Sequence, residues 1–141
     1  MDPAFWAKAH GASTHLPLAL AMCSWGFDAA GFVLISWPVA RQFSVVGYWT
    51  MLVGAMGTVP AVVSGLMLTK GEMMGHDVLL FHHLFVWPAY ALLVGLATWR
   101  WSVGVMAARR AFAGYLTVAF VAAGLLAGAG YWGGELLLGG T

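Results

Sequence analysis

The sequence predicts an all-α integral membrane protein in which four transmembrane helices form one up-down-up-down bundle. The first reason is composition: 62% of the 141 residues are hydrophobic and 8% are charged, whereas a soluble domain carries roughly 25% charged residues. The second is that four stretches approach or exceed the roughly 20 apolar residues that span a bilayer. The third is that the connections between them are short, which favours antiparallel neighbours.

The expected spans cover residues 14–37, 44–69, 78–99 and 111–136 of a single domain. A short interfacial segment precedes the first span, with Phe5 and Trp6 expected at the lipid headgroups. The first span carries Asp28 near its middle, the third opens with histidines, and the fourth ends with glycines and Glu135. The apolar runs do not alternate with a period of two, so a β-barrel is not expected.

The basic residues predict the orientation of the bundle. The first and third connections are expected to contain Arg41, Arg100, Arg109 and Arg110, whereas the other side has Lys8 and Lys70. Arginine and lysine are enriched in cytoplasmic connections. We therefore expect a multi-pass protein of a bacterial inner membrane with both termini outside. The formal net charge of +1 and the lack of a basic run give no reason to expect a nucleic-acid partner.

All five histidines fall on the outer side of this expected bundle. They are His10, His15, His76, His82 and His83. Histidine is costly inside a bilayer and is a common ligand for metals and haem. Two histidines from facing helices of a bundle can supply both axial ligands of a b-type haem. The clustering therefore predicts a bis-histidine haem b site near the outer face.

We expect the haem iron to be ligated by His15 and by His83 or His82. His76 and His83 are expected to share a helical face, since helical residues turn by about 100° each, whereas His82 points about 100° away. His10 and His76 are further candidates. No second set of histidines lies toward the cytoplasmic side, so we expect one haem. The alternative is that the imidazoles only form hydrogen bonds at a wet helix end.

Two carboxylates are candidates for proton-linked roles. Asp28 is costly at mid-span and is a functional candidate by default, unless it is hydrogen-bonded inside the bundle. Its expected hydrogen-bond partners are Ser24, Tyr48 or Thr58. Glu135, near the outer interface, could hydrogen-bond a ligand histidine, take up a quinol proton or face water.

The connection between the second and third spans contains possible copper ligands. Met73, Met74 and His76 have the softness that copper prefers, but methionine is also an ordinary apolar anchor, so copper is not expected. The chain has no phosphate-binding glycine loop, no GxSxG and no HExxH. We expect no independent catalytic activity, although the chain could be a subunit of an oxidoreductase complex.

Several motifs together resemble a family of small bacterial four-helix membrane proteins, catalogued as a domain of unknown function. The opening HGASTHLPLAL, with His10, His15 and Pro17, is similar to that family's first helix, where a histidine pair precedes Phe-Pro; here Leu16 replaces the phenylalanine. The histidines that open the third helix correspond to His82 or His83. The mid-helix Asp28 and the closing WGGEL, with Glu135, also match. The resemblance implies the four-helix fold and these polar positions, and it implies no activity.

These observations predict a b-type cytochrome-like electron-transfer subunit. It would link the quinone pool to an extracytoplasmic redox partner within a larger membrane complex. The alternative is a cofactor-free structural or assembly subunit of a respiratory or photosynthetic complex, because small-residue helix faces such as Gly57, Ala61 and Gly65 favour close helix packing. A transporter that uses Asp28 is a third hypothesis, disfavoured because four helices leave little room for a pathway.

Overall fold

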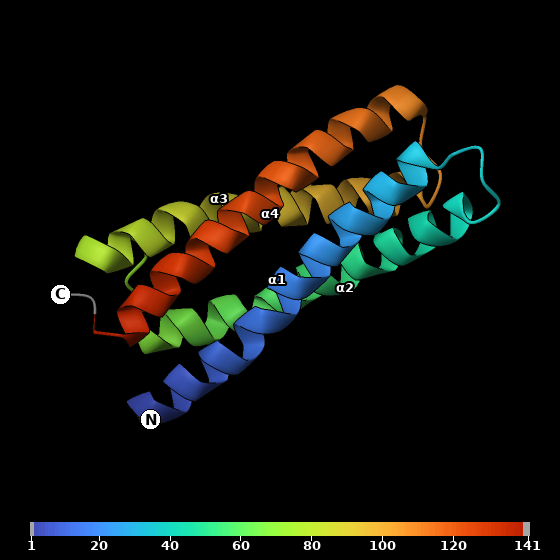
Figure 1. The fold of residues 1–141 in the computed structure, drawn as a ribbon. Coiled ribbons are helices and arrows are strands. Elements are labelled where there is room, and N and C mark those ends of the chain that lie inside the picture. Colours follow the sequence, from blue (N-terminus) through green and yellow to red (C-terminus); the bar gives the residue numbers. More distant parts are fainter. Residues whose placement is uncertain (1, 140–141) are drawn as a thin grey trace.

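A computed structural model describes residues 2–139, which form four antiparallel helices (Figure 1). They are α1 (Pro3–Val33), α2 (Ala40–Leu68), α3 (Asp77–Val103) and α4 (Arg109–Leu137). All four are long and apolar enough to cross a membrane, and the described residues contain no strand. The predicted all-α four-helix membrane bundle is therefore confirmed.

The first helix is longer than the sequence suggested. It begins at Pro3 rather than at residue 14, so the segment around Phe5 that was expected to lie at the interface is part of α1. Asp2 caps the helix, because its side chain accepts a hydrogen bond of 2.9 Å from the backbone N–H of Ala4. Proline at the first helical position is preset for the helical φ angle. These two residues explain the early start.

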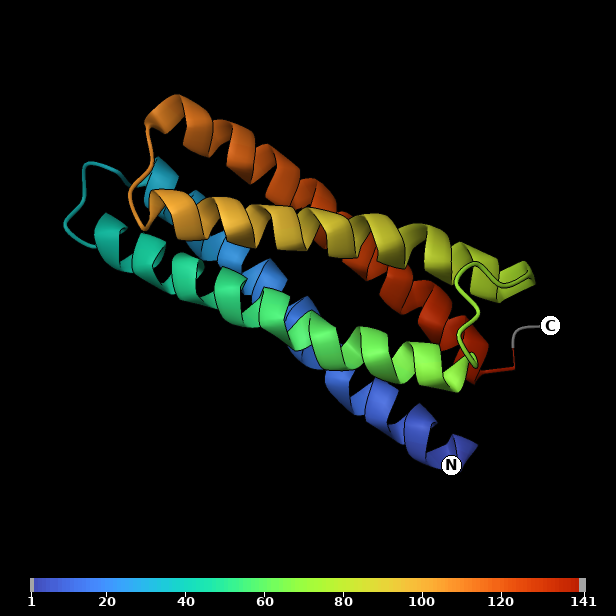
Figure 2. The same cartoon turned by 180° about the vertical axis from the view of Figure 1, so that it is seen from behind.

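The bundle has two chemically different ends. The start of α1, the end of α4 and the α2–α3 connection lie at one end, and the α1–α2 and α3–α4 connections lie at the other (Figures 1 and 2). We call the first the histidine end, because all five histidines lie in that half of the helices or in the α2–α3 connection. We call the second the arginine end, because Arg41, Arg109 and Arg110 lie there.

The four helices are arranged as two hairpins that meet along a seam. Contact is most extensive within the α1–α2 hairpin and within the α3–α4 hairpin, and less extensive between them. The hairpins bury residues at equivalent positions. On α1 the buried residues include Pro17, Ala21, Ser24 and Asp28. On α3 the residues with the same order and spacing are Ala89, Leu93, Leu96 and Arg100.

The same correspondence holds for the other two helices. On α2 the buried residues include Ser44, Gly47, Met51, Gly54, Ala55 and Ala61. On α4 the buried residues with the same order and spacing are Phe112, Tyr115, Ala119, Ala122, Ala123 and Ala129. The two hairpins therefore share one pattern of buried positions. Two equivalent pairs of α1 and α3, Asp28 with Arg100 and His10 with His82, meet across the seam.

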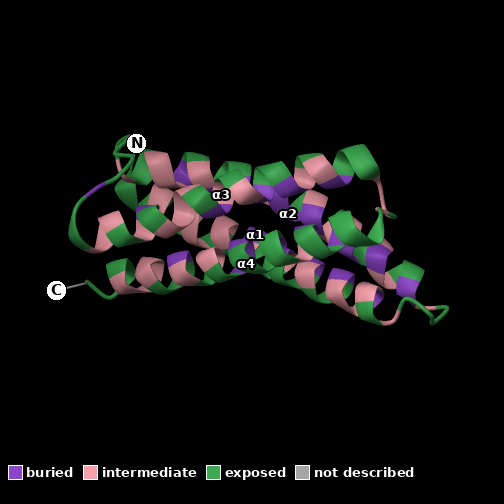
Figure 3. Cartoon of the chain, turned by 90° about the horizontal axis from the view of Figure 1, so that it is seen from above, coloured by how far each residue is buried: buried purple, intermediate pink, exposed green. Residues whose placement is uncertain are grey.

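The outer surface of the bundle is also apolar. Figure 3 shows buried residues along the inner faces of the helices and exposed residues outside. Large apolar side chains on the outside include Met56, Trp101 and Phe120, which are 72%, 71% and 61% exposed. A helix that is apolar on every side is typical of a membrane span, so the exposed surface fits contact with lipid.

Candidate functional site

Three of the five histidines come together at the histidine end. The ring centroids of His10 on α1 and His82 on α3 are 6.3 Å apart, and their planes are nearly perpendicular at 81°. The rings of His82 and His83 are 5.8 Å apart. His10 and His82 belong to different hairpins, so their imidazoles meet across the seam.

The hydrogen bonds of His10 and His82 define which ring nitrogen is available. Nδ1 of His10 lies 2.9 Å from the backbone oxygen of Ala61, and Nδ1 of His82 lies 2.8 Å from that of Ala129. Because a carbonyl oxygen only accepts, each Nδ1 donates, and Nε2 of each ring keeps its lone pair. Metal-ligating histidines commonly donate their other ring N–H to a carbonyl in this way.

A glycine on the neighbouring helix makes room for each of these rings. A Cβ atom added at Gly65 would lie 3.0 Å from Cε1 of His10, and one added at Gly133 would lie 3.4 Å from Cε1 of His82. Each glycine follows the alanine that accepts the imidazole hydrogen bond by about one helical turn. The two hairpins therefore hold their imidazoles with the same local arrangement.

The third histidine of the cluster has an unused polar atom. His83 is 6% exposed, and its Nδ1 is buried without a hydrogen-bond partner among the described residues. Its ring lies 6.0 Å from that of Trp87. Buried polar atoms are usually satisfied, so this nitrogen is available to a group that enters the cluster.

The remaining predicted residues lie outside this cluster. His15 is exposed and forms no ring contact with another histidine in residues 2–139, so its pairing with His83 stays a prediction. The expected shared helical face of His76 and His83 is wrong, because α3 begins at Asp77 and His76 precedes it in extended backbone. Glu135 is half-buried and forms no hydrogen bond within the described chain, so its proposed roles stay predictions.

Within residues 2–139, no group of three or more His, Cys, Asp or Glu side chains is placed to hold a metal ion. A haem differs from such a site, because the porphyrin supplies four ligands and the protein supplies at most two axial ones. A facing pair of imidazoles is therefore the donor set that this cluster offers.

A second polar cluster lies toward the arginine end of the bundle, around a buried ion pair. Asp28 is closer to the end of α1 at Val33 than the expected mid-span position. Arg100 donates from an Nη atom to Oδ1 of Asp28 at 3.0 Å, and both side chains are 0% exposed. Tyr115 donates from its hydroxyl to Oδ2 of Asp28 at 2.8 Å. Arg100 also donates to the backbone oxygens of Ser44 and Val105, at 3.1 and 3.3 Å.

This cluster corrects two predictions. Arg100 does not lie in a connection, because α3 continues to Val103 and turns the arginine into the bundle. Asp28 does not bond to Ser24, Tyr48 or Thr58; its partners are Arg100 and Tyr115.

The second cluster satisfies a carboxylate and a guanidinium that would each be costly alone. The guanidinium carbon of Arg100 lies 5.1–5.5 Å from the ring centroids of Tyr48, Phe112 and Tyr115, so aromatic faces surround the cation. Asp28 and Arg100 occupy equivalent positions on the two hairpins. Aligning the buried positions of α1 with those of α3 could have revealed the pair from sequence, because Asp28 and Arg100 then fall at the same position with opposite charges.

The fold and these clusters define a polytopic four-helix membrane protein in which each hairpin contributes one imidazole and one charged group to the seam. The chain belongs to the family described as predicted membrane protein (DUF2231), whose family model matches residues 8–139. This confirms the family resemblance drawn from the sequence motifs. A search among curated proteins and a search among solved structures each found no match.

Proposed function

We propose that this protein is a membrane-embedded electron-transfer subunit that binds one b-type haem at the histidine end. The observation that carries the proposal is the pair His10 and His82. Two imidazoles from opposite hairpins lie 6.3 Å apart across the seam, and each has Nδ1 committed to a carbonyl and Nε2 free. A bis-histidine haem supplies one-electron transfer without an open coordination position for a substrate.

The separation of the two rings supports this assignment. The centroids of the His10 and His82 rings are 6.3 Å apart, and the two residues belong to different hairpins, so one iron atom would be held from both hairpins. The seam is the less extensively packed boundary of the bundle, so a flat macrocycle would enter there, with the unpartnered His83 as a second ligand candidate.

The position of the site at one end of the bundle suggests the partners and the side of the membrane for electron exchange. A haem held near one end of the bundle would exchange electrons with a quinone in the membrane and a redox protein at that surface. Three arginines, Arg41, Arg109 and Arg110, remain near the connections of the opposite end, and they favour a cytoplasmic arginine end. The histidine end and both termini would then lie outside the inner membrane of a bacterium.

The test is the absorption spectrum of the purified protein, oxidised and then reduced, after expression with haem supply. We expect a sharp reduced α-band and a pyridine haemochrome of haem b. His10→Ala and His82→Ala should each abolish the low-spin spectrum, whereas the matched variants His15→Ala and His76→Ala, at exposed histidines, should retain it. A folded, helical protein without haem would overturn the proposal. Loss in His15→Ala instead of His10→Ala would restore the pairing expected from sequence.

A second candidate is the cofactor-free structural subunit. It is favoured by α4, where a Cβ added at Gly114, Gly124 or Gly134 would meet no atom within 4 Å. These glycines leave bare backbone for a neighbouring transmembrane helix to approach. In that case His10→Ala and His82→Ala would leave the activity of a co-purifying complex unchanged, whereas bulky residues at Gly124 would dissociate it.

A further inference from the structure

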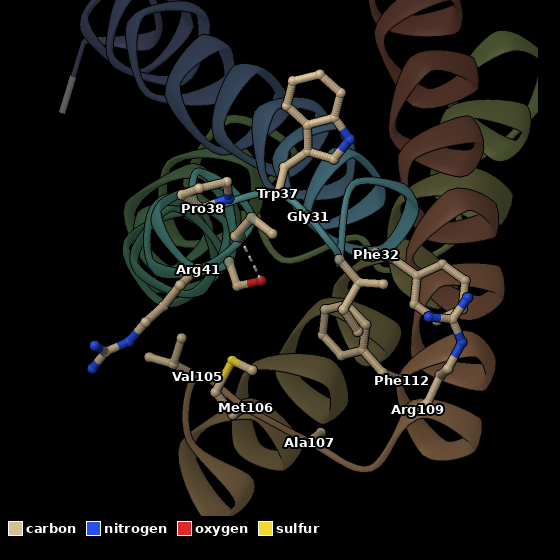
Figure 4. A pocket seen from close by; sticks show the side chains of 13 residues that line it. Gly31, Phe32, Trp37, Pro38, Arg41, Val105, Met106, Ala107, Arg109 and Phe112 are labelled. Carbon is tan, nitrogen blue, oxygen red and sulfur yellow. Dashed lines mark hydrogen bonds between the residues drawn. The ribbon is translucent and has the colours of Figure 1, made fainter.

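A cavity of about 270 Å³ lies at the arginine end, between the α1–α2 and α3–α4 connections (Figure 4). Much of its lining is apolar, with Phe32, Trp37, Met106 and Phe112. Arg41 and Arg109 also line it, and Figure 4 shows them on opposite sides, with the Arg41 side chain extending outward and the Arg109 guanidinium beside Phe32. The cavity therefore combines apolar walls with two cationic side chains.

The backbone adds to the positive potential at this cavity. Arg41 lies in the first turn of α2 and Arg109 is the first residue of α4. The N-terminus of a helix carries a partial positive charge, which favours an acidic residue and disfavours a basic one. Neither helix has an acidic residue in its first turn or a side-chain cap. In α2 the backbone N–H groups of Ala40 and Gln42 already donate to the backbone oxygens of Trp37 and Val39. The N-terminus of α4, which begins at Arg109, is therefore the helix end that adds a favourable potential for an anion at this cavity.

Arg109 is held in a defined position beside the cavity. Its guanidinium carbon lies 4.4 Å from the ring centroid of Phe32, which also lines the cavity. This cation–π contact orients the side chain without neutralising it. Within residues 2–139 neither Arg41 nor Arg109 forms a salt bridge, since the ion pair found there joins Arg100 to Asp28.

The inner wall of the cavity leads to Arg100. The backbone oxygens that accept its hydrogen bonds belong to Ser44 and Val105, and both residues line the cavity. Arg100 is fully buried, and its Nε has no hydrogen-bond partner among the described residues. Arg100 therefore lies behind the wall formed by Ser44 and Val105 and does not itself line the cavity.

We propose that this cavity binds the headgroup of an anionic phospholipid. The phosphate would lie between Arg41, Arg109 and the N-terminus of α4, and the start of an acyl chain would lie against Trp37 and Phe112. The ends of spanning helices lie at the depth of lipid headgroups, and basic pockets between such helices bind anionic headgroups. Inorganic phosphate would satisfy the cations but leave the aromatic walls uncovered, so the lining favours a lipid.

The test measures lipid binding to the purified full chain. The protein is placed in phosphatidylcholine nanodiscs, and its thermal unfolding midpoint is followed as phosphatidylglycerol replaces part of the lipid. We expect saturable stabilisation by phosphatidylglycerol. Arg41→Gln and Arg109→Gln should each weaken the apparent affinity about fivefold, as expected for one basic residue near anionic lipid. Arg110→Gln is the matched control, because Arg110 is exposed and does not line the cavity.

A steric variant keeps the test decisive if an arginine variant fails to fold. Ala107→Trp fills the cavity without removing a charge, and it should also weaken the effect of phosphatidylglycerol. Equal unfolding midpoints in both lipids for the unmodified protein would overturn the proposal. It would also be overturned if Arg110→Gln weakened the effect as much as Arg109→Gln, because general surface charge would then explain it. Stabilisation by inorganic phosphate alone would assign the site to a free anion instead.

Discussion

Replacing Arg100 by methionine tests whether the buried ion pair organises the seam between the hairpins. The substitution keeps a long apolar stem but removes the guanidinium. It deletes the hydrogen bonds to Asp28, Ser44 and Val105, and it ends the contacts with the surrounding aromatic faces. Asp28 would stay fully buried, with only the hydroxyl of Tyr115 near its charge.

The expected cost follows from the uncompensated carboxylate. Breaking a buried ion pair by removing one partner destabilises a protein by about 3–5 kcal/mol, because the remaining charge has lost its counter-ion. Both side chains here are 0% exposed, so solvent cannot screen the charge. We expect Arg100→Met to reduce the free energy of unfolding by about 3–5 kcal/mol, and Asp28→Asn to have a cost of the same order.

The double variant Asp28→Asn with Arg100→Met separates charge imbalance from lost packing. Removing both charges can be nearly neutral when the replacements fill similar volumes, and the asparagine can still accept from Tyr115. The double variant should therefore be more stable than either single variant. The assay is reversible unfolding in mixed micelles with increasing SDS, followed by helical circular dichroism. A loss below about 1 kcal/mol in Arg100→Met, or a double variant as unstable as the sum of the singles, would refute the reasoning.

Three further predictions use the same unfolding assay or the histidine cluster. Tyr115→Phe removes the hydrogen bond to Asp28 and the longer one to Ser24 and should cost about 0.6–2 kcal/mol; a loss as large as that of Arg100→Met would contradict it. Gly47→Ala places a methyl group against the carboxylate of the ion pair and should lower stability by at least about 1 kcal/mol, whereas Gly95→Ala, which meets nothing within 4 Å, should not. Gly65→Ala should displace the ring of His10 and shift its imidazole NMR resonances; an unchanged spectrum would show that the ring is not held by this glycine.

The sequence predicted part of the histidine site. It placed all five histidines in one half of the bundle, because helix order and span length decide depth along the bundle axis. It paired His15 with His83 or His82, whereas the structure places the rings of His10 and His82 next to each other, with nearly perpendicular planes. Depth along an axis follows from counting residues, but the face that a residue presents also depends on how each helix is rotated against its neighbours.

The burial of Arg100 is a second feature that the sequence did not predict. Its position near the end of a span, between two tryptophans, resembles that of an interfacial arginine in a connection. Its burial depends on α3 continuing to Val103 and on Asp28 lying opposite on α1. The sequence contains the signal for this pair only as a correspondence between the two hairpins, which becomes visible once the buried positions of α1 and α3 are compared.

The sequence by itself determined the class of protein, the number of spanning helices and the chemical difference between the two ends. These properties follow from local demands, since a bilayer requires about 20 apolar residues for each span and backbone hydrogen bonds satisfied within each helix. Only the tertiary structure decided that His10 meets His82, that Asp28 meets Arg100 and that Arg41 and Arg109 share a cavity. These contacts join residues from different hairpins, so they depend on how the two hairpins pack together.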